Sequence, residues 1–191
     1  MTRHTRPRPA CACARARIAT PPERAYTAFM LILRPMTAGD FERFVGHSAP
    51  QYAAEKVMSG EWTPEEAPER GDREFRQLLP QGQDTPDNHL FHLHDPQKGA
   101  DVGVLWYALQ TRAGSVTAFV YEVEIYEPHR RRGYATQAFA LLEHDAAVRG
   151  ATNIGLHVFG HNTGARALYE GMGFQTTNVI MRKELGTGQP D

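Results

Sequence analysis

The stretch EPHRRRGYATQAFALLEHDAAVRG, residues 127–150, decides how the rest of the chain is interpreted. Three arginines lead into Gly133, and the following residues have the spacing of an amphipathic helix that ends at Gly150. The first backbone N–H groups of a helix have no partner within it and lie at the positive end of its dipole. Gly133 and Ala135 let a ligand approach that backbone closely. The stretch therefore predicts an anion site suited to a pyrophosphate, with an exposed basic helix start as the alternative.

The segments on either side of this helix have the composition of strands. Residues 115–127 (SVTAFVYEVEIYE) give the longest strand signal in the chain, and residues 153–160 (NIGLHVFG) give another. Two strands that flank a helix are expected to be parallel neighbours joined by a right-handed crossover. The centre of the fold is therefore predicted to be a β-α-β unit. Residues 130–133, called the arginine loop below, form the turn between its first strand and its helix.

The remaining pattern completes a single α/β domain over residues 30–186. The first helix has an irregular apolar stripe with Pro50 as a break, and the second begins with a capping box from Thr63 to Glu66. Residues 1–29 are expected to form a disordered basic leader and residues 187–191 a disordered tail. The other strands are expected at 31–37, 90–95, 102–110 and 174–185, and the other helices at 38–60, 63–82 and 162–173.

Composition and charge narrow the class of protein. Of the 191 residues, 41% are hydrophobic and 23% charged, as in ordinary globular domains, and no run of about 18 apolar residues predicts a membrane span. The net charge of −1 divides unevenly, because residues 1–29 hold six arginines and one glutamate (+5) and the remainder carries −6. A nucleic-acid-binding arm is one interpretation, but the acidic body makes nucleic acid an unlikely partner. The only cysteines, Cys11 and Cys13, favour a reducing, cytoplasmic setting.

A second motif follows the arginine loop, and together the two resemble a known superfamily. The pair is similar to the two acyl-CoA motifs of the GNAT superfamily of N-acetyltransferases, over residues 31–185 and most strongly over 115–174. One departure is Ala135, where many members have glycine. The motifs read Arg130-x-x-Gly133-x-Ala135 and Asn162-x-x-Ala165-x-x-Leu168-Tyr169-x-x-x-Gly173-Phe174.

The resemblance implies a three-layer α/β domain. Its mixed sheet of six to seven strands splays between central parallel strands 4 and 5 and is flanked by helices. The co-substrate implied is acetyl-CoA, with its pantetheine arm in the splay and no metal. The residues implied to bind the coenzyme are Val123, Glu124, Ile125, Arg130, Arg131, Arg132, Gly133, Tyr134, Ala135, Thr136, Asn162, Ala165 and Tyr169.

Two carboxylates in the long strand are candidates for the general base. Strict alternation would place Val120, Glu122, Glu124 and Tyr126 on one face of the strand. A central strand of an α/β sheet is covered on both faces, so carboxylates there are costly unless they face a wet site or have partners. At least one is expected to act on the acceptor amine, and the sequence does not choose between Glu122 and Glu124.

Tyr169 is the candidate general acid. In the GNAT superfamily a tyrosine at the matching position often protonates the sulfur of coenzyme A. The alternative comes from the residues themselves, because Ala165, Leu168, Tyr169 and Met172 have the spacing of a buried helical stripe.

The sequence therefore favours an acetyl-CoA-dependent N-acetyltransferase with direct attack in a ternary complex. The alternative is a non-catalytic acyl-CoA-binding sensor. The acceptor is a small-molecule amine or a protein amino group, a homodimer is compatible with the chain, and the histidines lack a recognised metal spacing. A preference for basic acceptors follows from the acidic residues of the domain: Glu122 and Glu124, with Glu61, Glu65, Glu66 and Glu69 near the second helix.

Overall fold

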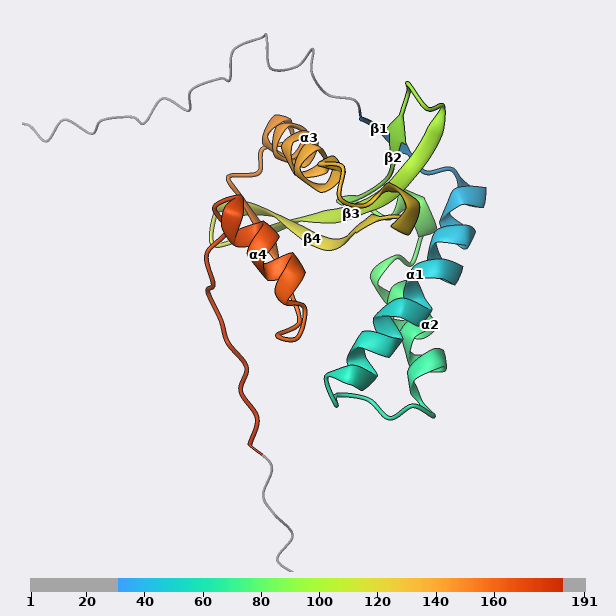
Figure 1. The fold of residues 1–191 in the computed structure, drawn as a ribbon, viewed down its shortest axis with the longest axis vertical. Helices are drawn as coiled ribbons and strands as arrows, with labels where there is room; N and C mark the ends of the chain where they lie inside the picture. The colour runs from blue at the N-terminus through green and yellow to red at the C-terminus, as the bar shows by residue number, and fades with distance from the viewer. Residues whose placement is uncertain (1–30, 184–191) are drawn as a thin grey trace, which may run out of the picture.

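The computed structural model describes residues 31–183, which form one α/β unit (Figure 1). The expected basic leader over 1–29 and the tail over 187–191 lie outside the described residues. Along the chain the helices are α1 (Ala38–Met58), α2 (Ala67–Leu78), α3 (Tyr134–Val148) and α4 (Thr163–Gly171), with short 3-10 turns at Gly82–Asp84 and Glu127–His129. The strands are β1 (Ile32–Pro35), β2 (Asn88–Asp95), β3 (Ala100–Arg112), β4 (Ser115–Ile125) and β5 (Asn153–Leu156).

The sheet has five strands in the order β1-β2-β3-β4-β5. Neighbours are antiparallel except β4 and β5, which are parallel and joined through α3, as the β-α-β pattern predicted. Pairing of β4 with β5 covers only Thr117–Val120 against Asn153–Leu156. Because β4 continues to Ile125 while β5 ends at Leu156, the two strands part and leave residues 121–125 without a β5 partner. The predicted splay between the central parallel strands is confirmed.

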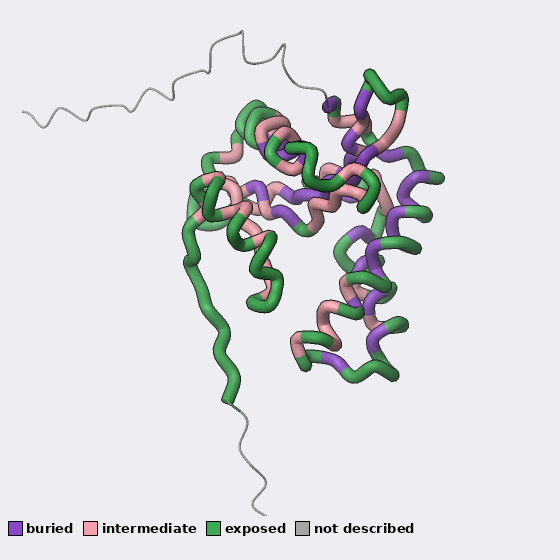
Figure 2. The backbone as a smooth tube through the Cα atoms, viewed as in Figure 1, coloured by how far each residue is buried: buried purple, intermediate pink, exposed green. Residues whose placement is uncertain are grey.

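Helices cover both faces of the sheet, so the fold has three layers (Figures 1 and 2). Successive residues of β3 enter opposite cores, as expected for a strand buried on both sides. Leu105 and Tyr107 pack with Phe139 and Leu142 of α3, whereas Val104 and Trp106 pack against α1 and α2. No helix within residues 31–183 is long and apolar enough to cross a membrane.

The first helix is more regular than its sequence suggested, and it ends two residues before the predicted 38–60 range does. Pro50 was expected to break it, but α1 continues through Pro50 for 21 residues. A proline inside a helix loses one hydrogen bond and crowds the preceding turn. Burial of Phe44, Val45 and Ala49 against the sheet and α2 offsets that cost.

The second helix begins later than predicted. The reciprocal capping contacts do form, because Thr63 N donates to Glu66 Oε1 at 3.0 Å and Glu66 N donates to Thr63 Oγ1 at 3.4 Å. The regular helix starts only at Ala67, so residues 63–66 make a capping turn ahead of it.

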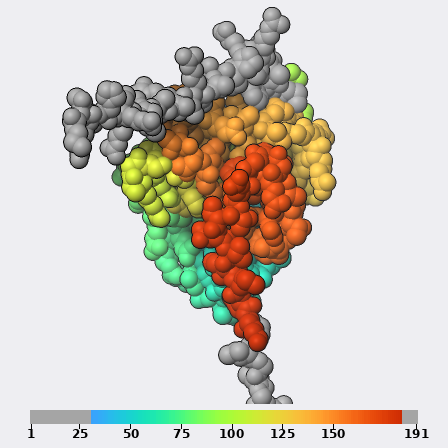
Figure 3. All heavy atoms as spheres, turned by 90° about the vertical axis from the view of Figure 1, so that its left-hand side faces the viewer, coloured from blue at the N-terminus to red at the C-terminus, as the bar shows by residue number. Residues whose placement is uncertain are grey.

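The predicted closing strand is wrong for residues 174–183, which have no regular secondary structure. The segment has the composition of a strand, but Val179, Ile180 and Met181 are 72%, 93% and 89% exposed. A strand exists only where its N–H and C=O groups meet a neighbour, and among residues 31–183 β5 pairs with β4 alone. The sheet therefore has five strands rather than six or seven. Figure 3 shows this segment running with α4 over one face of the molecule.

Candidate active site

The arginine loop forms a strained backbone concavity ahead of α3. Arg131 has φ of 61° and Gly133 has φ of 76°, both in the left-handed region. Residues other than glycine rarely adopt such a φ, and for arginine this backbone conformation costs about 1–2 kcal/mol. Gly133 is the N-cap of α3 and has no side chain to cap the helix. Alternating backbone conformations of this kind aim successive N–H groups at one point and make a concavity for anions.

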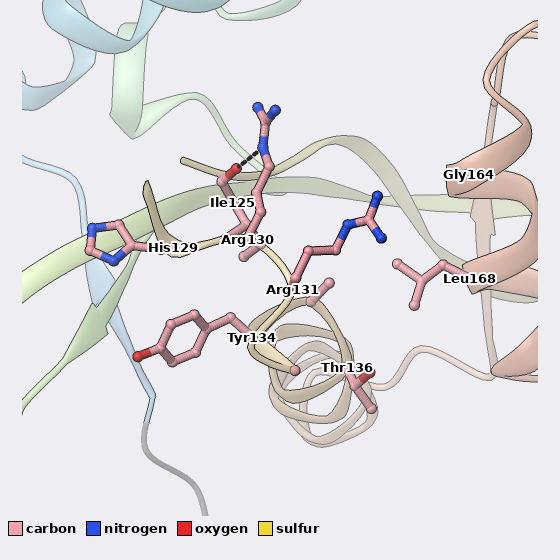
Figure 4. A pocket seen from close by; sticks show the side chains of 10 residues that line it. Ile125, His129, Arg130, Arg131, Tyr134, Thr136, Gly164 and Leu168 are labelled. Atoms are coloured by element: carbon pink, nitrogen blue, oxygen red, sulfur yellow. Dashed lines mark hydrogen bonds between the residues drawn. The ribbon is translucent and has the colours of Figure 1, made fainter. Parts of the chain in front are cut away.

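A cavity of about 420 Å³ lies against this loop (Figure 4). One wall is the loop with the start of α3, and the other is α4, which contributes Gly164 and Leu168. These two residues and His129 were not predicted to line the site. Gly164 and Leu168 are four residues apart, so they share one face of α4, and this spacing was a signal available in the sequence. The predicted residues that line the cavity are Ile125, Arg130, Arg131, Gly133, Tyr134, Ala135 and Thr136.

The three arginines have different orientations. In Figure 4 the side chain of Arg131 extends across the cavity toward Gly164 and Leu168. The Arg130 side chain does not lean toward α4 in this view, and its Nε donates to the Ile125 carbonyl at 2.8 Å. Arg132 is exposed and is not among the residues that line the cavity.

Tyr134 belongs to the cavity wall, but its hydroxyl is engaged elsewhere. The side chain is buried, and the hydroxyl donates to Asp95 Oδ2 at 2.6 Å. The same oxygen accepts a hydrogen bond from Lys98. The Tyr134 hydroxyl therefore fixes the start of α3 to the end of β2 and the turn that follows it. These contacts hold the arginine loop in place beside the sheet.

A β-bulge decides which way the carboxylates of β4 point. Trp106 of β3 pairs with Glu122, and the next residue of β3 pairs with Val120, so Tyr121 is an extra residue in β4. The bulge reverses the alternation of the strand. Val120 packs in the core beneath α3, whereas Glu122 and Glu124 contact α1. The expectation that Val120 shares a face with the two carboxylates is therefore wrong, and the expectation that the carboxylates share a face is right.

Glu122 is the more desolvated of the two carboxylates. Burial raises its pKa from 4.5 to about 7. The Ser48 hydroxyl of α1 donates to Glu122 Oε1 at 2.6 Å, which opposes the rise, and the negative charge of Glu124 adds to it. A carboxyl group with this pKa exchanges its proton near neutral pH.

Glu124 has charged neighbours instead. Its Oε2 lies 2.8 Å from Nε2 of His47 on α1, and its Oε1 lies 3.5 Å from Nη2 of Arg130. Gly103 on β3 allows this end of the strand to pack closely, because a Cβ there would lie 2.0 Å from the Glu124 carbonyl oxygen. The two carboxylates therefore differ in role, one desolvated and one ion-paired.

The second motif spans α4 and its two ends, and of its residues Leu168 lines the cavity whereas Asn162, Ala165 and Tyr169 do not. The Asn162 side chain caps α4 by accepting a hydrogen bond from Ala165 N at 3.1 Å, as local rules predicted. The ring of Tyr169 packs edge-on to Phe139 at 5.5 Å and lies 5.8 Å from Phe174. Burial raises the pKa of the Tyr169 hydroxyl, which keeps it protonated. This environment is compatible with both the proton donor and the core tyrosine.

A smaller cavity of about 290 Å³ lies beside Glu124 on the α1 side, and its wall includes His47, His92 and Tyr126. His94 is bonded to Asp101 at 2.8 Å. Within residues 31–183 no group of three or more His, Cys, Asp or Glu side chains is arranged to hold a metal ion.

Comparison with known proteins shows the family to which this protein belongs. The sequence profile described as the Acetyltransferase (GNAT) family matches residues 54–174. The chain therefore belongs to the GNAT family of acetyltransferases.

Two curated proteins of Bacillus subtilis (strain 168) are similar along most of the chain. The first, Uncharacterized N-acetyltransferase YycN, is 41% identical over 155 residues, which is 81% of this chain and 99% of that protein. The second, Uncharacterized N-acetyltransferase YdgE, is 35% identical over 153 residues, covering 80% and 97%.

Solved structures agree with this assignment. The crystal structure of YycN superimposes with a TM-score of 0.77 over 81% of this chain and 98% of that one. A metagenomic aminoglycoside acetyltransferase at 17% identity superimposes with a TM-score of 0.53, over 83% of this chain and 100% of that one, and shows the fold alone.

Proposed function

We propose that the protein is an acetyl-CoA-dependent N-acetyltransferase that moves an acetyl group to a primary amine by direct attack in a ternary complex. One observation carries the proposal: the anion loop and the desolvated Glu122 carboxyl belong to the same stretch of chain, on either side of the end of β4. That end is the part of β4 that has no β5 partner. A thioester held in the splay by its pyrophosphate would therefore lie beside a carboxyl group with a pKa of about 7.

The proposed coenzyme site consists of backbone N–H groups and a positively charged side chain. The pyrophosphate binds the N–H groups of residues 131–136 and the Arg131 guanidinium, because a helix start and a left-handed turn present donors to an anion. The pantetheine arm follows residues 123–125, whose backbone has no β5 partner on that side. The α4 wall with Gly164 and Leu168 closes the cavity on its other side.

Glu122 is assigned as the general base. Its ionised carboxylate takes one proton from the acceptor ammonium, directly or through water, and the neutral nitrogen then attacks the thioester carbonyl carbon. The carbon–sulfur bond breaks in the next step, and the departing sulfur takes the Tyr169 hydroxyl proton. The nitrogen loses its second proton through water to the Tyr169 phenolate, which leaves a neutral amide and a neutral thiol, and Glu122 returns its proton to the solvent. Base and acid contributions of this kind are each worth about 10²–10⁴ in rate. Glu124, beside His47 and Arg130, is a second carboxylate on the acceptor side.

The acceptor is a basic amine, and this proposal depends on the two carboxylates of β4. The acidic residues near α2 contribute less than their number suggests, because three of the four already have basic partners. These pairs are Glu61 with Lys56 at 2.7 Å, Glu66 with Arg70 at 3.7 Å and Glu69 with Arg73 at 3.4 Å.

The test is a screen that measures thiol release from acetyl-CoA in the presence of amines and lysine-containing peptides. The proposal predicts turnover with a basic acceptor that rises with pH through about 7, as Glu122 ionises. Calorimetric binding of acetyl-CoA with no turnover across the panel would favour the non-catalytic sensor. A chain that binds no coenzyme A would refute both.

A further inference from the structure

The three consecutive arginines of the loop share a sequence motif but occupy three environments. Arg131 extends across the coenzyme cavity toward α4, and Arg132 lies outside the cavity. Arg130 also lines the cavity, and its guanidinium is bonded to the carbonyl at the end of β4 (Figure 4). The resemblance to other GNAT proteins implied that all three bind the coenzyme.

The guanidinium of Arg130 already has two partners. Its Nε donates to the carbonyl of Ile125, the last residue of β4, at 2.8 Å. Its Nη2 lies 3.5 Å from Glu124 Oε1, while the other oxygen of Glu124 lies 2.8 Å from His47. These contacts hold the Arg130 guanidinium at the end of β4 through its Nε and Nη2, whereas Arg131 extends across the cavity.

The contacts of Arg130 connect the coenzyme loop to the carboxylate pair. The charged and titratable groups that face Glu124 are His47 from α1, Arg130 from the loop, Glu122 from the same strand and Tyr126 just beyond it. Of these, Arg130 is the one that also belongs to the coenzyme loop. Its side chain therefore connects the loop that faces the cavity to the Glu124 carboxylate.

We propose that Arg130 is a positioning residue, which fixes the end of β4 and the Glu124 carboxylate, and that the pyrophosphate is bound by Arg131 and the loop backbone. The part of this inference that concerns turnover rests on the proposed function. The part that concerns coenzyme affinity does not.

The experiment replaces each arginine in turn by glutamine in the full-length protein. Calorimetry with coenzyme A measures affinity, and acetyl transfer measures kcat and KM. Arg131→Gln should weaken coenzyme affinity by about tenfold or more, because a charge-assisted contact is lost. Arg130→Gln should change affinity by no more than about twofold but lower kcat by about tenfold, the cost of a misplaced catalytic group. Arg132→Gln removes the same charge from a side chain outside the cavity, so it should weaken coenzyme affinity by less than Arg131→Gln does.

The titration of Glu122 gives a readout that needs no turnover. Without Arg130, the negative charge of Glu124 acts on Glu122 with less compensation, so the NMR titration of the Glu122 carboxyl should move to higher pH. Arg130→Lys should restore part of kcat, since an ammonium can replace one of the two contacts.

Two results would overturn the inference. One is a loss of coenzyme affinity in Arg130→Gln as large as that in Arg131→Gln, which would make Arg130 a phosphate ligand. The other is an Arg130→Gln protein with unchanged affinity, turnover and Glu122 titration. If the wild type binds coenzyme A without transferring acetyl groups, the proposed function fails, while affinity and titration still decide the role of Arg130.

Discussion

Replacing Glu122 by glutamine should make the protein more stable and less active. A folded-state pKa of about 7 against 4.5 means that ionising the carboxyl group costs the fold about 3 kcal/mol, at about 1.4 kcal/mol per pH unit. Glutamine has the shape of the protonated acid and still accepts the Ser48 hydrogen bond. At pH 8 Glu122→Gln should therefore raise the free energy of unfolding by up to about 3 kcal/mol, which is several degrees in Tm for a chain of this size.

The sign of the pH dependence is a second part of this prediction. Between pH 4.5 and about 7 the unfolded carboxyl group is ionised while the folded one is still protonated, so stability contributed by Glu122 is lost as pH rises through this window. The advantage of Glu122→Gln over the wild type should grow across the window and vanish below it. Urea denaturation at pH 4.5, 6 and 8 measures this, and acetyl transfer should fall by about 10²–10⁴.

Glu124→Gln is the matched control. Glu124 lies in the same strand but is paired with His47 and Arg130. Removing its charge loses these pairs and also eases the ionisation of Glu122, so the net change in stability should be at most about 1 kcal/mol. Equal stability of wild type and Glu122→Gln at pH 8 would show that Glu122 is not desolvated. Full acetyl transfer by Glu122→Gln would remove it as the base.

Four further changes test other parts of the site. Ser48→Ala removes the hydrogen bond to Glu122, so the pH profile of kcat/KM should move to higher pH, and an unchanged profile would mean that this contact does not matter. Gly133→Glu should abolish coenzyme binding measured by calorimetry while circular dichroism stays native, with Gly133→Ala as the control for the strain of φ 76°. Tyr169→Phe should bind coenzyme but turn over about 10²–10⁴ more slowly, whereas a core tyrosine predicts a wild-type rate. A chain that begins at Met30 should match the full chain in Tm and coenzyme affinity, and a large loss of either would show that the leader contacts the domain.

The sequence alone predicted those parts of the site that depend on residues close together in the chain. The arginines and the glycine before an amphipathic helix predicted a loop-to-helix start there, and the strand–helix–strand order predicted the parallel β4 and β5. Asn162 predicted its own cap on α4. Each depends on backbone geometry or hydrogen bonds within a few residues, which spacing in the sequence records directly.

The tertiary structure alone decided which carboxylate is desolvated. Glu122 and Glu124 are equivalent in the sequence, and a single extra residue, Tyr121, turns both toward α1 by a bulge that no local pattern announced. Ser48 then bonds one carboxylate and His47 the other, from positions 74 and 77 residues earlier in the chain. The closing strand was overpredicted for the same reason, because a strand needs a partner and composition supplies none. Desolvation, ion pairing and strand pairing all depend on atoms brought from distant segments, so they exist only once the chain is folded.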